Sequence, residues 1–202
     1  MSSSSKFFKK YTLNNKVEVP SLLAVAPMTL FGSNPDGTIG DEERNFYKQR
    51  ATGIGLYIVG ATCVSLEGLA FDNQPRAFDD KDLPSNKERV KIIKEQGALA
   101  INQIHHGGCL GLKRLSGVPV MAVSADVFNK ELEKKGELKE DTKAVEITEK
   151  DILLMISPEL QKYQSKLDMM VLKFMVRIII YCNNFIQDII IKELMNGEAL
   201  LL

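Results

Sequence analysis

The residues Ala98-Leu99-Ala100-Ile101-Asn102-Gln103-Ile104 form a largely apolar run that ends in His105-His106-Gly107-Gly108. A short apolar run closed by polar and glycine residues is typical of a strand in a buried parallel sheet. Two earlier segments have the same form, namely Ser21 to Met28, which contains Pro27 near its end, and Leu56 to Thr62. We therefore expect three strands that are each buried on both faces.

Helical patterns separate these strands. Three acids at positions 41–43 stand at the start of a predicted helix that ends near Arg50, where they favour the positive end of the helix dipole. A capping-box pattern, Ser85-Asn86-Lys87-Glu88, begins a second helix that should stop near Gly97. Strands that alternate with helices predict an α/β fold with a parallel sheet, and such folds carry their chemistry at the C-terminal ends of the strands.

The composition excludes several classes of protein. Lys plus Arg is 26 and Asp plus Glu is 26, so the net charge is zero and no basic footprint for nucleic acid or an anionic membrane is present. Cys63, Cys109 and Cys182 are odd in number and widely spaced, which predicts neither a zinc site nor a disulfide framework. The first six residues lack the apolar core of a signal peptide. We therefore expect a cytoplasmic protein.

Three strand ends hold the candidate chemistry. Gly60 and Ala61 close the second strand, where small residues permit a flat ligand to approach the backbone, although tight strand–helix packing also requires them. Gln103 closes the third strand and offers a donor and an acceptor, which suits the edge of a heteroaromatic ring. The adjacent His105 and His106 have no carboxylate or cysteine at metal-site spacing, so we predict no metal site.

Taken together, these segments resemble the N-terminal half of the old yellow enzyme family of FMN-dependent NAD(P)H oxidoreductases. The resemblance runs from about residue 6 to about residue 167, and its matched features are Val25-Ala26-Pro27-Met28-Thr29, the Gly53 to Gly68 stretch, Gln103-Ile104-x-His106-x-Gly108 and Val120 to Ala125. It implies a (β/α)8 barrel with FMN at its C-terminal mouth. It also implies NAD(P)H as the electron donor and a small enone or enoate substrate, whose activated C=C bond receives a hydride from reduced FMN.

The resemblance further implies which residues contact the cofactor. Ala61 would lie against the isoalloxazine ring, Gln103 would hydrogen-bond its pyrimidine edge, and a threonine at the position of Thr29 tunes the flavin. The residues of the first strand end that would pack on or hydrogen-bond the ring are Ala26, Pro27, Met28 and Thr29.

Two positions depart from the family pattern. Cys109 stands where the family usually has an arginine. Phe31 stands near the position of a tyrosine that helps to hold substrate in many members. A phenylalanine preserves an apolar wall but donates no hydrogen bond, so the resemblance assigns no substrate contact to this loop.

The last part of the chain differs from the rest. Thirteen of the 14 glycines lie at or before Gly136, and seven isoleucines crowd between Ile178 and Ile191. The fourth-strand motif of the family, Asp-Gly-Val-Glu-Ile-His-Gly-Ala-Asn, holds its substrate-binding groups and is absent after Asp168. We therefore expect a family domain over residues 1–167, a helical, Ile-rich, non-family tail over residues 168–202, and no catalytic residue.

We hypothesise that this tail is the fourth strand of the family read one nucleotide out of frame. When the last base of one codon is read with the first two bases of the next, Met169-Met170 must give aspartate, and Met170-Val171 and Met175-Val176 must each give glycine. Met195-Asn196 must give glutamate. These four residues fall where the family motifs require them. The alternative is an evolved amphipathic helix, whose uncharged run from Ile178 to Gln187 is only ten residues, too short for the ~20 of a membrane span.

The length also bears on function. A complete barrel takes roughly 250 residues, and this chain has 202, so we expect a partial barrel of three βα units. Its strand edges would be exposed and open to self-association. The phosphate site of such barrels is built after strands seven and eight, so we expect weak FMN binding and little catalysis. A charged run, Lys130 to Lys143, predicts a solvated excursion, and Thr148 to Asp151 is a capping pattern.

Two other interpretations remain open. The chain could be a non-catalytic interaction protein that associates with a partner, or with itself, through the C-terminal amphipathic helix. A barrel fragment with aldolase chemistry is disfavoured, because no lysine at the predicted strand ends suits a Schiff base.

Overall fold

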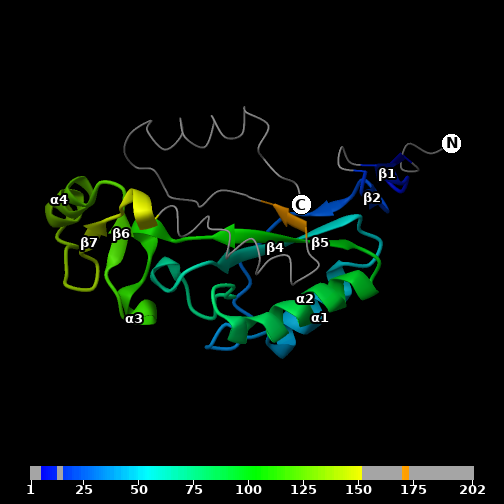
Figure 1. The fold of residues 1–202 in the computed structure, drawn as a ribbon, viewed down its shortest axis with the longest axis horizontal. Helices are drawn as coiled ribbons and strands as arrows, with labels where there is room; N and C mark the ends of the chain where they lie inside the picture. Colours follow the sequence, from blue (N-terminus) through cyan, green and yellow to red (C-terminus); the bar gives the residue numbers. More distant parts are fainter. Residues whose placement is uncertain (1–5, 13–15, 152–169, 173–202) are drawn as a thin grey trace.

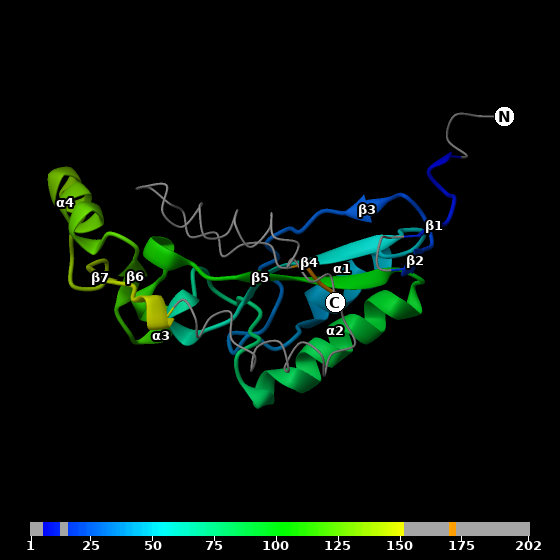
Figure 2. The same ribbon diagram turned by 45° about the horizontal axis from the view of Figure 1, so that its top comes forward.

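The computed structural model describes residues 6–12, 16–151 and 170–172. Its centre is a four-stranded parallel sheet in the order β3-β4-β5-β8. The helices α1 (Asp41–Arg50) and α2 (Leu83–Glu95) lie side by side on one side of this sheet, below it in Figures 1 and 2. The parallel sheet with its intervening helices confirms the α/β prediction. The strands are β3 (Ala24–Val25), β4 (Leu56–Cys63), β5 (Leu99–His105) and β8 (Met170–Leu172).

Smaller units stand at the two ends of this sheet. Near the N-terminus, β1 (Tyr11–Thr12) pairs antiparallel with β2 (Glu18–Val19). At the other end, β6 (Val120–Ala122) pairs parallel with β7 (Ala144–Glu146), beside α3 and α4 (Figure 1). The remaining elements are α3 (Lys113–Ser116), α4 (Ala125–Lys135) and the 3-10 turns Leu66–Gly68, Asp80–Asp82 and Gly108–Leu110.

The main core lies between the sheet and the two helices. Tyr57 and Val59 of β4 are buried against Tyr47 of α1 and Ile93 of α2. The alternate positions Leu56 and Ile58 are only half-buried, so the first part of β4 buries one face, as the two-residue period of a strand dictates. In β5, by contrast, the consecutive residues Ala100, Ile101 and Asn102 are all buried. The prediction of strands buried on both faces is therefore wrong for β3, whose two residues are exposed and half-buried, and for the first part of β4, but it is confirmed for the middle of β5.

The helix boundaries differ in how well the sequence predicts them. The first helix has its predicted bounds, because acids stand in its first turn and Arg50 in its last. The second begins at Leu83, so the predicted cap at Ser85 is wrong. The Ser85 hydroxyl is buried and accepts a hydrogen bond of 2.6 Å from the Ile39 amide, while a capping box of Asp79 and Asp82 stands before the helix.

The charged run predicted as a solvated excursion begins with the last part of a helix and continues as a loop. Most of its charged side chains are exposed, as predicted, but α4 continues through Lys135 and ends at Gly136 in the left-handed conformation that favours glycine. Phe128 packs on the small core of β6 and β7, and Asn129 donates to and accepts from the backbone of Ala144.

The predicted capping pattern after this unit is present. The Thr148 amide and hydroxyl both donate to the Asp151 carboxylate, and the Asp151 amide donates to the Thr148 hydroxyl. A helix begins at residue 149, as predicted.

The strand β8 corrects one prediction about the tail. Residues 170–172, which the sequence analysis assigns to a helical tail, pair in parallel with Ile101–Gln103 of β5, and the helical prediction is wrong for them. Pairing supplies their backbone groups with the hydrogen bonds of a ladder. The rest of the predicted tail, with most of the segment that the frame change concerns, lies outside the described residues.

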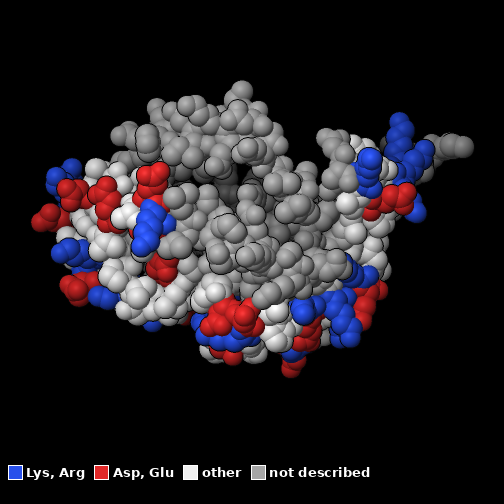
Figure 3. All heavy atoms as spheres, in the orientation of Figure 1, with Lys and Arg blue, Asp and Glu red and all other residues white. Residues whose placement is uncertain are grey.

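Charge is mixed over the surface. On the face shown in Figure 3, lysines and arginines of the described residues lie among aspartates and glutamates rather than in a patch of one sign. This mixture agrees with equal totals of 26 basic and 26 acidic residues. None of the helices that the structure describes has the length and apolar character that a membrane crossing requires.

Candidate active site

The ends of the first two strands meet through a glycine. The parallel register Ala24–Leu56 and Val25–Tyr57, continued by three residues, sets Met28 beside Gly60. A Cβ atom on Gly60 would lie 2.1 Å from the Met28 carbonyl oxygen, a distance that no real Cβ atom adopts. The space at Gly60 is therefore occupied by protein backbone. This contact is with the neighbouring strand end and not with a helix, so it differs from the predicted strand–helix packing.

The next residue joins the second and third strand ends. Ala61 has φ of 44°, in the left-handed region, and it lies where the register between β4 and β5 shifts, between Val59 and Thr62. Its amide donates a 3.0 Å hydrogen bond to the side-chain oxygen of Gln103. The amide nitrogen of Gln103 has no hydrogen-bond partner among residues 6–12, 16–151 and 170–172, so it keeps a donor at this edge of the sheet.

The first strand end presents apolar surface. Met28 is 48% exposed and Phe31, three residues further, is 62% exposed. Exposed large apolar side chains gathered at strand ends indicate a surface for a ligand or partner. Ala61 differs, because it is 7% exposed and contributes mainly backbone. Four residues of this segment are predicted to contact the ring. Ala26, Met28 and Thr29 are exposed, and Pro27 is half-buried.

An aromatic row lies beside these residues. The ring of Phe31 meets that of Phe71 edge to face, with 5.5 Å between centroids. Phe71 in turn lies 6.3 Å from the ring of His105, at the C-terminal end of β5. Phe31 is thus part of an apolar wall, as its side chain implies, and the row connects the loop after β3 to the end of β5.

His106 is turned inward, unlike a residue that binds a ligand from solvent. It is fully buried, and its Nδ1 accepts a 2.9 Å hydrogen bond from the Gly108 amide, so Nε2 carries the proton. Nε2 faces the Glu67 carboxylate at 3.9 Å, and His106 holds the pKa of Glu67 at about 2. Within the described ranges no three His, Cys, Asp or Glu side chains gather as metal ligands would.

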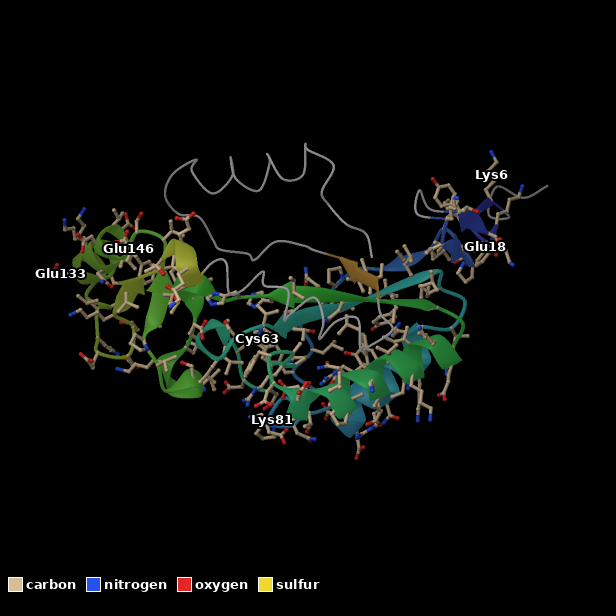
Figure 4. All side chains as sticks on the ribbon, viewed as in Figure 1. Lys6, Glu18, Cys63, Lys81, Glu133 and Glu146 are labelled. Carbon is tan, nitrogen blue, oxygen red and sulfur yellow. The ribbon has the colours of Figure 1, made fainter. Side chains whose placement is uncertain are left out.

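The described cysteines are not reactive thiols. Cys63 is buried at the end of β4 (Figure 4), and burial raises the pKa of its thiol to about 12. Burial also raises the pKa of Cys109, which packs on the core of β6, β7 and α4. Because the thiolate is the nucleophile, neither side chain is prepared for covalent chemistry. Cys182 lies outside the described residues.

A buried ionic cluster braces the loop that follows β3. Arg89 of α2 and Glu43 of α1 are 1% and 0% exposed and form an ion pair at 2.9 Å. Arg89 also donates to the Gly37 carbonyl, and the Ser33 hydroxyl donates to Glu43 at 2.7 Å. Burial alone would raise the pKa of Glu43, but the hydrogen bonds and charge of Arg89 bring it below the ordinary value. Residues 33–37 are therefore fixed relative to both helices.

One residue at the site escapes sequence reasoning. Gln74 is 2% exposed and lies in the long loop between β4 and α2, where no periodic pattern marks buried positions. The side-chain amide of Gln74 donates a hydrogen bond to the carbonyl of Ala61. Gln74 therefore binds the carbonyl of Ala61, and Gln103 binds its amide. The neighbouring Pro75 is the one local signal of a fixed conformation.

Comparison with known proteins identifies the family to which this chain is similar. Residues 6–158 match the model of the NADH:flavin oxidoreductase / NADH oxidase family. The chain is 40% identical over 101 residues to the probable NADH-dependent flavin oxidoreductase YqiG of Bacillus subtilis, covering 50% of this chain and 27% of that protein. It is 35% identical over 108 residues to the NADH:fumarate oxidoreductase of Klebsiella pneumoniae, covering 54% of this chain and 12% of that protein. It thus spans less than a third of either relative.

Solved structures agree with the fold. The old yellow enzyme of Pichia sp. superposes with a TM-score of 0.69 at 23% identity, over 82% of this chain and 45% of that one. At this identity the likeness concerns the fold alone, and it supports the parallel arrangement of strands and helices described above. Since the family model covers most of the sequence, the chain belongs to the NADH:flavin oxidoreductase / NADH oxidase family, to which the old yellow enzymes are related by fold.

Proposed function

We propose that this sequence encodes the N-terminal part of an FMN-dependent NAD(P)H oxidoreductase that reduces activated C=C bonds. The observation that carries the proposal is the meeting of three strand ends. Met28 lies against Gly60, Ala61 donates to Gln103, and the amide of Gln103 keeps a donor at the same edge. FMN and NAD(P)H are the cofactors that family membership implies.

The residues at this edge suit a flat heteroaromatic ring. Met28 offers exposed apolar surface, and the Gln103 amide would donate to an acceptor at the pyrimidine edge of the isoalloxazine. Thr29 is exposed and would tune the ring through its hydroxyl. When bound, FMN would supply hydride transfer to an enone or enoate. The proposed contacts are Ala26, Pro27, Met28, Thr29, Ala61 and Gln103.

We also propose that the 202-residue chain alone holds FMN weakly. Phosphate sites in such barrels are built by the loops after strands seven and eight, and the described sheet has four parallel strands. We assign no substrate to this chain from the names of its relatives, because the match to the fumarate oxidoreductase covers only 12% of that protein.

A titration tests the ring contacts. FMN added in excess to isotopically labelled chain should shift the amide signals of Thr29, Ala61 and Gln103, with weak and saturable binding. Gln103→Leu should reduce these shifts, whereas Gln96→Leu, which changes a glutamine at the end of α2, should leave them unchanged. Shifts that are absent, or that lie outside the strand ends, would overturn the proposal. Purification with stoichiometric, reducible FMN would instead contradict weak binding.

The division of the chain at residue 167 is part of this proposal. We propose that residues 168–202 are read out of frame from a gene whose next frame encodes the fourth-strand motif. The nucleotide sequence for Met169 to Met175 tests this directly, and codons that fail to spell the motif in the shifted frame would refute it.

A further inference from the structure

The carbonyl side of Ala61 depends on a buried glutamine. In a regular strand the amide and carbonyl of Ala61 would join the ladder with β5, but the register shifts between Val59 and Thr62. Gln103 accepts the amide at 3.0 Å, and Gln74 donates to the carbonyl at 2.9 Å. A non-glycine residue in a left-handed conformation persists only where its surroundings hold it there. Two glutamine side chains from different elements therefore hold this turn of the backbone.

The orientation of the Gln74 amide is determined by backbone partners. Its oxygen accepts a 2.9 Å hydrogen bond from the Ala70 amide, which can only donate. Its nitrogen donates to the Ala61 carbonyl, which can only accept. Reversing the amide would place donor against donor and acceptor against acceptor, so the assignment of nitrogen and oxygen is fixed.

This orientation in turn determines the state of His105. The Gln74 nitrogen lies 3.0 Å from Nδ1 of His105 and, as an amide nitrogen, can only donate. Nδ1 must then accept, and the ring proton is on Nε2. His105 is half-buried at the C-terminal end of β5, and its ring meets that of Phe71.

We propose that Gln74 is a positioning residue for the flavin site. It holds the strained Ala61 backbone and fixes His105 in the Nε2-protonated tautomer at the mouth of the sheet. The inference rests on the proposed function, because Ala61 acquires a role only if a ring lies at this edge. The contact pattern itself involves only residues of this chain.

The chain offers a favourable way to test the tautomer. It has two histidines, His105 and His106, so a long-range 1H–15N correlation of the imidazoles gives two ring systems. His105→Gln, which changes a half-buried side chain, assigns them. We expect both rings to carry the proton on Nε2, since the Nδ1 of His106 accepts from the Gly108 amide. A proton on Nδ1 of His105 in the unaltered chain would overturn the proposal without any variant at Gln74.

A substitution then tests the dependence on Gln74. In Gln74→Glu the carboxylate still accepts from the Ala70 amide, but it cannot donate to the Ala61 carbonyl or to His105. We expect Nδ1 of His105 to gain a proton and the carbonyl 13C signal of Ala61 to shift, while His106 stays unchanged. Gln96→Glu is the matched control, because Gln96 only accepts from the Thr52 hydroxyl there. A His105 ring that keeps its state in folded Gln74→Glu would contradict the proposal.

These signals do not require flavin. If FMN fails to perturb the strand ends while the histidine signals behave as expected, the proposed function fails and the contact pattern stands. If FMN binds at the strand ends but His105 carries its proton on Nδ1, the role of Gln74 fails alone.

Discussion

At the scale of single residues, the buried pair Glu43–Arg89 should dominate the stability of the loop after β3. Glu43→Gln leaves the guanidinium of Arg89 buried without its counter-charge, which typically costs about 3–5 kcal/mol. Urea denaturation should show this loss in the free energy of unfolding. Glu88→Gln is the control, since its partner Arg44 and Glu88 itself are 31% and 41% exposed and such pairs contribute under about 1 kcal/mol. Equal losses in the two variants would contradict the prediction.

Glu67 should make the free energy of unfolding depend on pH in the acidic range. Its pKa is about 2 in the folded chain against an ordinary 4.5, with His106 as the main cause. A group whose folded pKa is lowered stabilises the fold above the unfolded pKa, and that contribution is lost as pH falls from about 4.5 toward 2. Glu67→Gln should therefore flatten the fall in stability over this window, with a difference on the order of 2 kcal/mol.

The measurement for Glu67 is a difference between two curves. Other carboxylates, Glu43 among them, also lose stabilising contacts in acid, so only the curve of wild type minus variant isolates Glu67. Denaturation at several pH values between 2 and 6 gives both curves. A difference that does not change with pH would mean that Glu67 titrates normally.

At the scale of elements, Gly60 decides whether β3 can join the sheet. In Gly60→Ala the new methyl would meet the Met28 carbonyl at 2.1 Å and force β3 away from β4. We expect a loss of roughly 3 kcal/mol or more, by analogy with overpacked cores. Gly97→Ala is the control, because nothing lies within 4 Å there and only its positive φ of 89° costs about 1 kcal/mol. Thermal unfolding compares the two, and a Gly60→Ala chain as stable as Gly97→Ala would refute the close approach.

The elements that the sequence predicts best are those with local determinants. Acids in the first turn and Arg50 in the last mark α1, and apolar runs mark β4 and β5. The start of α2 is missed, because Ser85 resembles a cap but its hydroxyl binds the Ile39 amide, a partner 46 residues away. Local pattern cannot reveal such a long-range hydrogen bond.

The residues of the candidate site also divide into those that local sequence marks and those that only long-range contacts reveal. Gln103 is recognisable because it ends an apolar run, whereas Gln74 sits in a loop and becomes important only through contacts with Ala61 and His105. Likewise the left-handed conformation of Ala61 has no signal in a sequence that places alanine there, since this conformation usually favours glycine. Tertiary hydrogen bonds decide both cases.

At the scale of the whole molecule, one sheet edge and its surroundings should favour self-association. β3 stands at an edge of the described sheet, and Leu22, just before it, is 52% exposed. Exposed edges offer unpaired backbone groups, and adjacent apolar side chains increase the gain from covering them. We propose that two copies of the chain associate through this edge, which would also protect Met28 and Phe31 at its C-terminal end.

Light scattering after size-exclusion chromatography tests this association over a range of concentrations. The mean mass should rise with concentration for the unaltered chain, and Leu22→Lys should suppress the rise by placing a charge at the edge. Leu66→Lys is the matched control, since Leu66 is 41% exposed but lies in the 3-10 turn after β4 and not on a sheet edge. A constant monomer mass would exclude association, and equal suppression by both variants would mean that general hydrophobicity, rather than the edge of β3, drives it.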